Sequence, residues 1–351
     1  MLTVSKTVSD VFPEPGLIRR YTGIQCSHPL FYDIETTGLS RTSAFIYMIG
    51  ASRWTGEEWQ FRQWMAESPE EESRLLRSFE DFLQDSDAAI QFNGDAFDAP
   101  FIAARAGAAG LTSGLDHLPS FDLLRNLRTV GRLLMLPGLK QIHFEGFLCG
   151  ENRKSVDGRA GITLYHRYCR NPSPALAGIL LMHNEEDILG LGRIFCLLSY
   201  RQLFTGDWEP VSCSLRHDGS SAPSSGLHGE WLHFTLRLLD TLPRELSVRY
   251  SDFLLTACGH CVEADILLKD GKLRVYHPDY KNYDYLPEED TAIPKALSAF
   301  IERGRKKTAV PETCYTWFRI SSAFFQDQHS QRRYLKAALP VLLGRSDPKA
   351  Q

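Results

Sequence analysis

The chain has 351 residues, of which 43% are hydrophobic, and its formal net charge is −4. A chain of this length and composition buries a substantial core and is long enough for two domains. No stretch reaches the apolar length of a membrane span and the first residues lack a signal-peptide core, so we expect a cytoplasmic protein without a membrane partner.

The acidic excess lies in the first part of the chain. Residues 1–204 contain 20 Lys and Arg against 24 Asp and Glu, whereas residues 205–351 contain 19 against 19. This distribution argues against tight, sequence-independent binding of duplex nucleic acid through a large basic face.

The first acidic motif ends a predicted strand. Residues 30–35, 45–54 and 58–65 read as consecutive strands, and residues 55–57 fit a hairpin turn between the last two. Side chains two residues apart on a strand share a face, so Asp33 and Glu35 lie side by side. Such a pair either stays solvated or binds a divalent cation, and oxygen ligands suit Mg²⁺ or Mn²⁺.

A second acidic segment, residues 93–98, follows a predicted helix over 69–83 and a predicted strand over 88–92. Asp98 stands where the next helix begins, with Pro100 tolerated in its first turn. Asp is a favoured N-cap residue, so either capping or metal binding explains this position. A fifth strand over 120–123 and a helix over 123–135 come next.

The third motif lies on a predicted helix from 174 to 201. His183 and Asp187 are four residues apart and therefore share one face of this helix. A lone helical histidine is usually structural, but this one has an acid one turn away and follows two acidic motifs.

The three motifs resemble, in this order, those of the DEDD superfamily of 3′–5′ exonucleases, in the DEDDh branch with a histidine base. They read Asp-Ile-Glu-Thr-Thr-Gly-Leu, Phe-Asn-Gly-x-x-Phe-Asp-x-Pro-Phe and His-Asn-x-x-Asp. More narrowly, they look like the YprB-type ribonuclease H-like family over roughly residues 20–204. The resemblance implies an α/β, ribonuclease H-like fold, which is a mixed central sheet with flanking helices.

The resemblance also implies the residues of the site. Four acids are similar to the ligands of two Mg²⁺ or Mn²⁺ ions: Asp33, Glu35, Asp98 and Asp187. His183 would orient or deprotonate the attacking water, and Asp98 is preferred to Asp95 because it follows Phe97, as the family pattern requires. Candidate substrate contacts are Thr36, Asn93, Arg153 and Lys154.

The activity implied by the resemblance is hydrolysis of phosphodiester bonds by a metal-dependent nuclease, specifically a 3′–5′ exonuclease. Two metal ions and a neutral imidazole supply the nucleophile, the charge neutralisation and the base that this reaction needs. The expected partner is DNA or RNA, single-stranded or with a 3′ end. An endonuclease, or an inactive binding or scaffold protein on the same fold, is the alternative.

The rest of the chain suggests a second region without a family assignment. We expect a first domain over 1–204, a linker or long loop over 205–229, and a C-terminal α+β region over 230–351. Strands are predicted over 231–239, 246–255, 261–268 and 272–276, and helices over 288–303 and 330–343. The tyrosine-rich residues 276–285 and the basic residues 303–307 either pack structurally or bind unpaired bases.

Eight scattered cysteines fit reduced thiols in a cytoplasm. Cys258 and Cys261 form the one Cys-x-x-Cys pair, which predicts a hairpin turn between strands or, as the less favoured interpretation, part of a zinc site.

Overall fold

The computed structural model describes residues 1–150, 158–217 and 229–345. The chain forms two compact units, the first made of residues 1–131 and 135–198 and the second of residues 132–134 and 199–351. Among the described residues, no helix is long and apolar enough to cross a membrane.

Six strands form the sheet of the first unit, in the order β1-β4-β3-β2-β5-β6. Their bounds are β1 (Leu2–Val8), β2 (Pro29–Thr36), β3 (Ile46–Trp54), β4 (Trp59–Met65), β5 (Ala88–Gln91) and β6 (Ser120–Asp122). The strands β1, β4, β3 and β2 pair antiparallel, whereas β2 with β5 and β5 with β6 pair parallel. The predicted mixed central sheet is therefore confirmed. The strand β1 was not predicted from the sequence, because it is an edge strand whose exposed polar residues weaken its apolar pattern.

The strand β2 is buried along nearly its whole length because β3 and β5 pair with it on either side. Leu30, Tyr32 and Ile34 belong to the hydrophobic cluster on one face of the sheet. Successive strand side chains point to opposite faces, so Asp33 and Glu35 point to the other face.

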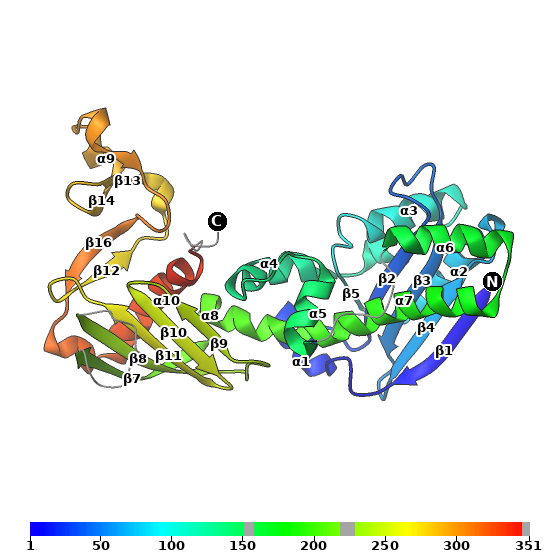
Figure 1. Ribbon diagram of the computed structural model, residues 1–351, viewed down its shortest axis with the longest axis horizontal. Coiled ribbons are helices and arrows are strands. Elements are labelled where there is room, and N and C mark those ends of the chain that lie inside the picture. The colour runs from blue at the N-terminus through cyan, green and yellow to red at the C-terminus, as the bar shows by residue number, and fades with distance from the viewer. Residues whose placement is uncertain (151–157, 218–228, 346–351) are drawn as a thin grey trace. The chain divides into compact units, whose positions relative to one another are not determined.

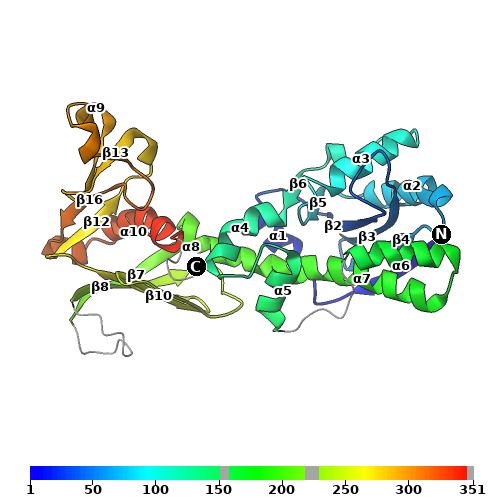
Figure 2. The same ribbon diagram turned by 45° about the horizontal axis from the view of Figure 1, so that its top comes forward.

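Helices cover both faces of this sheet. They are α1 (Pro15–Thr22), α2 (Glu72–Leu83), α3 (Asp98–Ala108), α4 (Leu123–Leu133), α5 (Gln141–Cys149), α6 (Gly158–Arg170) and α7 (Pro174–Ile194), with 3₁₀ turns at Pro69–Glu71, Gly114–His117 and Phe195–Arg201. The helices α2 and α3 contribute to the hydrophobic cluster on the first face, and α6 and α7 contribute to the cluster on the second (Figures 1 and 2). The acids of β2 therefore face α7.

The second unit is built around a five-stranded antiparallel sheet in the order β7-β8-β11-β10-β9, against which the last helix packs. Its elements are α8 (Gln202–Thr205), β7 (Trp208–His217), β8 (Glu230–Leu238), β9 (Leu246–Arg249), β10 (Phe253–Cys258), β11 (Cys261–Leu267), β12 (Lys272–Tyr276), β13 (Tyr283–Leu286), β14 (Thr291–Pro294), α9 (Lys295–Ser298), β15 (Lys307–Thr308), β16 (Tyr315–Arg319) and α10 (Gln328–Leu343), with 3₁₀ turns at Tyr280–Asn282, Arg303–Arg305 and Ser322–Phe325. The strands β12 and β16 form a ribbon, and β14-β13-β15 form a small separate sheet.

Three predictions for this unit differ from the structure. Residues 208–217 of the expected linker form β7, which pairs with β8, while residues 218–228 lie outside the described residues. The expected strand over 246–255 is two strands, β9 and β10, which pair with each other across a turn. The expected helix over 288–303 contains only the short α9, because residues 291–294 pair with β13 instead.

The Cys-x-x-Cys segment is a hairpin turn. Cys258 and Cys261 face each other in the register of β10 and β11. Gly259 has a φ of 56°, a left-handed conformation that glycine adopts without strain. The hairpin interpretation is therefore confirmed.

Candidate functional site

The helix α7 brings the third motif over the acids of β2. It begins at Pro174, where the fixed φ of proline suits the first turn, and the Ser173 hydroxyl accepts a hydrogen bond from the Leu176 amide. From this start, His183, Asn184 and Asp187 fall on the side of the helix that contacts β2 and β3.

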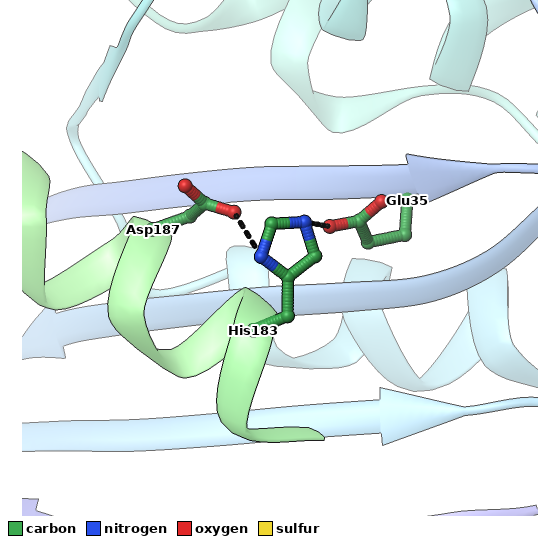
Figure 3. Close-up of side chains that lie close together, drawn as sticks. All are labelled: Glu35, His183 and Asp187. Atoms are coloured by element: carbon green, nitrogen blue, oxygen red, sulfur yellow. Dashed lines mark ion pairs between the residues drawn. The ribbon is translucent and has the colours of Figure 1, made fainter. Parts of the chain in front are cut away.

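His183 lies between two carboxylates (Figure 3). Its Nε2 is 3.2 Å from Glu35 Oε1 and its Nδ1 is 3.6 Å from Asp187 Oδ2. Glu35, His183 and Asp187 are the one group of three or more metal-ligating side chains brought together in the described part of the chain. His183 Nδ1 is buried and has no hydrogen-bond partner there. An acid on β2 and an acid on α7, far apart in sequence, thus share one imidazole.

Tyr47 holds the other oxygen of Glu35. Its hydroxyl donates to Glu35 Oε2 at 3.3 Å, and its ring stacks on Tyr165 of α6 with centroids 4.1 Å apart. Burial raises the pKa of the Tyr47 phenol, and the Glu35 carboxylate raises it further, so this hydroxyl keeps its proton. The Glu35 carboxylate is therefore oriented by a tyrosine on one side and by His183 on the other.

Asp33 is oriented by a buried amide. Asn184 Nδ2 donates to Asp33 Oδ2 at 3.1 Å, and Asn184 Oδ1 accepts from Gln63 Nε2 at 3.0 Å. Both amide side chains are fully buried. The space for Asn184 comes from Gly50, since a Cβ at that position would lie 2.1 Å from Asn184 Oδ1.

Asp98 reaches the same strand from the start of α3. It is buried, and its Oδ1 accepts a hydrogen bond from the Ile34 amide at 3.2 Å. Burial, together with the negative charges of Asp122 and Asp187, raises the pKa of the Asp98 carboxyl from 3.8 to about 7, although the Ile34 hydrogen bond opposes the shift. An ionised Asp98 therefore needs a nearby positive charge.

Asp95 has a different environment. It is exposed, accepts hydrogen bonds from Gln91 and Ser120, and lies 3.7 Å from Arg125. Of the two acids in this segment, Asp98 contacts the strand that carries Asp33 and Glu35.

The expected substrate-binding residues that the structure describes lie in different environments. The Thr36 hydroxyl is buried and donates to the Gly38 carbonyl at 2.8 Å, so it is engaged in the turn after β2. Asn93 is exposed in the turn after β5 and has a φ of 64°. Arg153 and Lys154 lie outside the described residues.

Three residues near the predicted acids were not predicted from the sequence: Tyr47, Gln63 and Asp122. Asn184 stands in the third motif, but no role was predicted for it. Asp122 ends β6 and accepts hydrogen bonds from the Asn93 and Arg125 amides. An acid at a strand end is the signal used for Asp33 and Glu35, and it could have found Asp122 as well. Tyr47 and Gln63 lie inside apolar strands and give no local signal.

The residues present suit divalent metal ions. Several carboxylates lie around the end of β2, and one of them, Asp98, has a raised pKa and forms no ion pair with a Lys or Arg of the described ranges. Oxygen ligands of this kind bind Mg²⁺ or Mn²⁺, which would supply the missing positive charge.

Comparisons with known proteins identified a matching family and similar chains. Residues 30–199 match a family model described as the RNase_H superfamily. The uncharacterized protein YprB of Bacillus subtilis (strain 168) is 28% identical over 187 residues, and the match covers 52% of this chain and 44% of that protein. This chain therefore corresponds to less than half of that relative. Among solved structures, the family B DNA polymerase of the archaeon Pyrobaculum calidifontis aligns with a TM-score of 0.39 and 18% identity, over 51% of this chain and 25% of that one.

Proposed function

Because residues 30–199 match the RNase_H superfamily model, we propose that this protein is a metal-dependent nuclease acting on DNA or RNA. More narrowly, we propose a 3′–5′ exonuclease of the DEDDh type that removes nucleotides from a single strand or a 3′ end. The observation that best supports this proposal is the position of His183 between Glu35 and Asp187.

We propose that Asp33, Glu35, Asp98 and Asp187 bind two Mg²⁺ or Mn²⁺ ions. When bound, such ions generate the nucleophile, polarise the phosphate and stabilise the leaving oxygen. The buried hydroxyl of Tyr47 and the amide of Asn184 each hold one carboxylate oxygen. These contacts fix the orientation of Glu35 and Asp33 before any ion binds, which reduces the entropy lost on binding.

His183 has the role of proton acceptor in this proposal. We assign the ring hydrogen to Nε2, which lies 3.2 Å from Glu35 Oε1, so that Nδ1 would accept the proton of the attacking water. The adjacent Asp187 carboxylate stabilises the imidazolium that results. Histidine is the side chain that most often serves as a general base in enzymes.

The test is digestion of labelled single- and double-stranded DNA and RNA with Mg²⁺, Mn²⁺ or chelator. A strand labelled at its 5′ end should shorten stepwise from the 3′ end only when metal is present. A 3′-terminal phosphorothioate should slow the digestion. Asp98→Asn should abolish it, whereas the matched variant Asp95→Asn should retain it, because Asp95 lies outside the acid cluster.

The alternatives give different products. An endonuclease cuts a circular single strand, which has no 3′ end, and that result would replace the exonuclease proposal. A binding or scaffold protein leaves every substrate intact with either metal, and that result would refute the nuclease proposal.

We propose a cytoplasmic setting for this activity. The eight cysteines are free thiols, as is usual in a reducing compartment.

A further inference from the structure

The small sheet of the second unit carries an exposed aromatic side chain. Phe300 follows α9 and is 91% exposed, and Leu297, three residues earlier, is 61% exposed. The segment lies at the end of the unit remote from the five-stranded sheet (Figure 1). An exposed apolar pair of this kind loses the stabilisation that burial gives, so it indicates a contact surface.

A polar network holds this segment in place. The Ser298 hydroxyl donates to Asp284 of β13, and the Lys306 ammonium donates to the Ser298 carbonyl and lies 3.6 Å from Asp284. Asp284 and Ser298 are buried. Because Ser298, the last residue of α9, is tied to β13 in this way, the segment that carries the exposed Phe300 is anchored to the fold.

The charge around Phe300 is positive. Residues 295–308 contain five Lys and Arg and one acid, Glu302. Lys306 is used internally, and Arg305 pairs with Glu288 and Glu289. The other three cations are exposed and form no ion pair with any described residue: Lys295, Arg303 and Lys307. The Lys295 ammonium donates to the Lys281 carbonyl at 2.7 Å. Exposed cations close in sequence to an exposed ring suit a partner that offers both negative charge and a flat apolar face.

The nearby tyrosines are occupied in the fold. Tyr276 is buried, and the hydroxyls of Tyr285 and Tyr315 both donate to Asp290. The tyrosine-rich segment is therefore largely structural, and Phe300 is the most exposed large hydrophobic side chain in the described part of the chain.

We propose that the 295–307 surface, formed by Lys295, Leu297, Phe300, Arg303 and Lys307, binds single-stranded nucleic acid. An unpaired base stacks on Phe300, and the cations contact the neighbouring phosphates. A duplex offers no accessible base face, and a protein partner would need a larger apolar area than two side chains provide. The inference rests on the proposed function only in its choice of nucleic acid as the partner.

The experiment measures fluorescence anisotropy of the full chain with labelled 20-nucleotide thymidine and uridine strands in chelator, which prevents hydrolysis. Phe300→Ala should weaken binding about fivefold to 150-fold, the range for loss of one stacked base. Phe300→Tyr keeps the ring and should bind as wild type. Phe300→Leu keeps the apolar bulk without the ring and should bind as weakly as Phe300→Ala.

The salt dependence tests the cations. Each phosphate contact to a single strand contributes about 0.7 to the slope of log K against log salt, so Arg303→Ala with Lys307→Ala should reduce the slope by about 1.4. Arg249→Ala with Arg319→Ala removes the same charge from exposed positions of the same unit and should leave the slope unchanged.

Each possible result of these experiments either supports or overturns the inference. Wild-type affinity in Phe300→Ala, or full binding by Phe300→Leu, overturns it. So does a dimer that Phe300→Ala converts to monomer with unchanged strand affinity, since that result makes the surface a contact between copies. Wild-type protein that binds strands through Phe300 but hydrolyses none with metal supports this inference and refutes the proposed nuclease. Hydrolysis of a five-nucleotide strand that persists in Phe300→Ala, together with weaker 20-mer binding, supports both.

Discussion

Replacing Asp98 with Asn should make the stability of the metal-free protein less sensitive to high pH. The Asp98 carboxyl is buried, and burial together with the charges of Asp122 and Asp187 raises its pKa from 3.8 to about 7. Asparagine keeps the shape of the side chain and the oxygen that accepts from the Ile34 amide, but it carries no charge. The variant therefore removes the titration and preserves the contact.

The size of the effect follows from the pKa difference. The folded protein holds the Asp98 proton more tightly than the unfolded chain does. Between about pH 4 and pH 7 the unfolded chain has lost this proton and the folded protein has not, so the free energy of unfolding falls as the pH rises. A shift from 3.8 to about 7 is about three pKa units, and at 1.36 kcal/mol per unit the total loss is about 4 kcal/mol. About 3 kcal/mol of this loss falls between pH 5 and pH 8.

The assay is urea unfolding in chelator at pH 5 and pH 8, read by hydrogen exchange of peptides from β2 and α3. This readout reports the first unit separately, which matters because a chain of two units need not unfold in one step. Between pH 5 and pH 8, the free energy of unfolding of the wild type should fall by about 3 kcal/mol more than that of Asp98→Asn. Asp95→Asn, which removes an exposed acid three residues away, should behave as wild type.

Bound metal should reverse this loss of stability in the wild type. If Asp98 is a ligand, millimolar Mg²⁺ should restore the stability of wild type at pH 8 and restore much less in Asp98→Asn, because the ion compensates the ionised carboxylate. The same loss between pH 5 and pH 8 in wild type and in Asp98→Asn, both in chelator, would refute the reasoning.

Three further predictions concern the rest of the site. Asp187→Ala should abolish metal-dependent cleavage while the fold survives, since it removes one of several repelling acids; undiminished turnover in a radiolabelled-strand assay contradicts its role. His183→Ala should reduce the cleavage rate about 10²–10⁴-fold with metal affinity nearly intact, and calorimetry showing metal binding lost with the imidazole would make it a ligand instead. Gly50→Ala places a Cβ 2.1 Å from Asn184 Oδ1 and should destabilise the first unit by about 1–3 kcal/mol in urea unfolding. Gly107→Ala, in open space on α3, should be neutral or stabilising by up to about 1 kcal/mol, and equal effects of the two glycine variants would contradict the packing argument.

Local patterns in the sequence were sufficient for the elements that carry the motifs. The apolar run before Asp33 and Glu35 predicts β2, and a strand's two-residue period puts both acids on one face. The four-residue spacing of His183 and Asp187 predicts that they share a helix face, and both lie beside the same acid in the structure. These features follow from backbone geometry within a few residues, so the sequence alone determines them.

Only the tertiary structure decided how these elements meet. Gln63 and Asn184 are 121 residues apart, and their hydrogen bond depends on the register of α7 across β4, which no local pattern records. The same limit explains the failed helix over 288–303. Its Ala- and Glu-rich sequence favours a helix locally, but residues 291–294 gain more by pairing with β13. Propensity differences are a fraction of a kcal/mol per residue, so long-range pairing and burial determine the outcome wherever the two disagree.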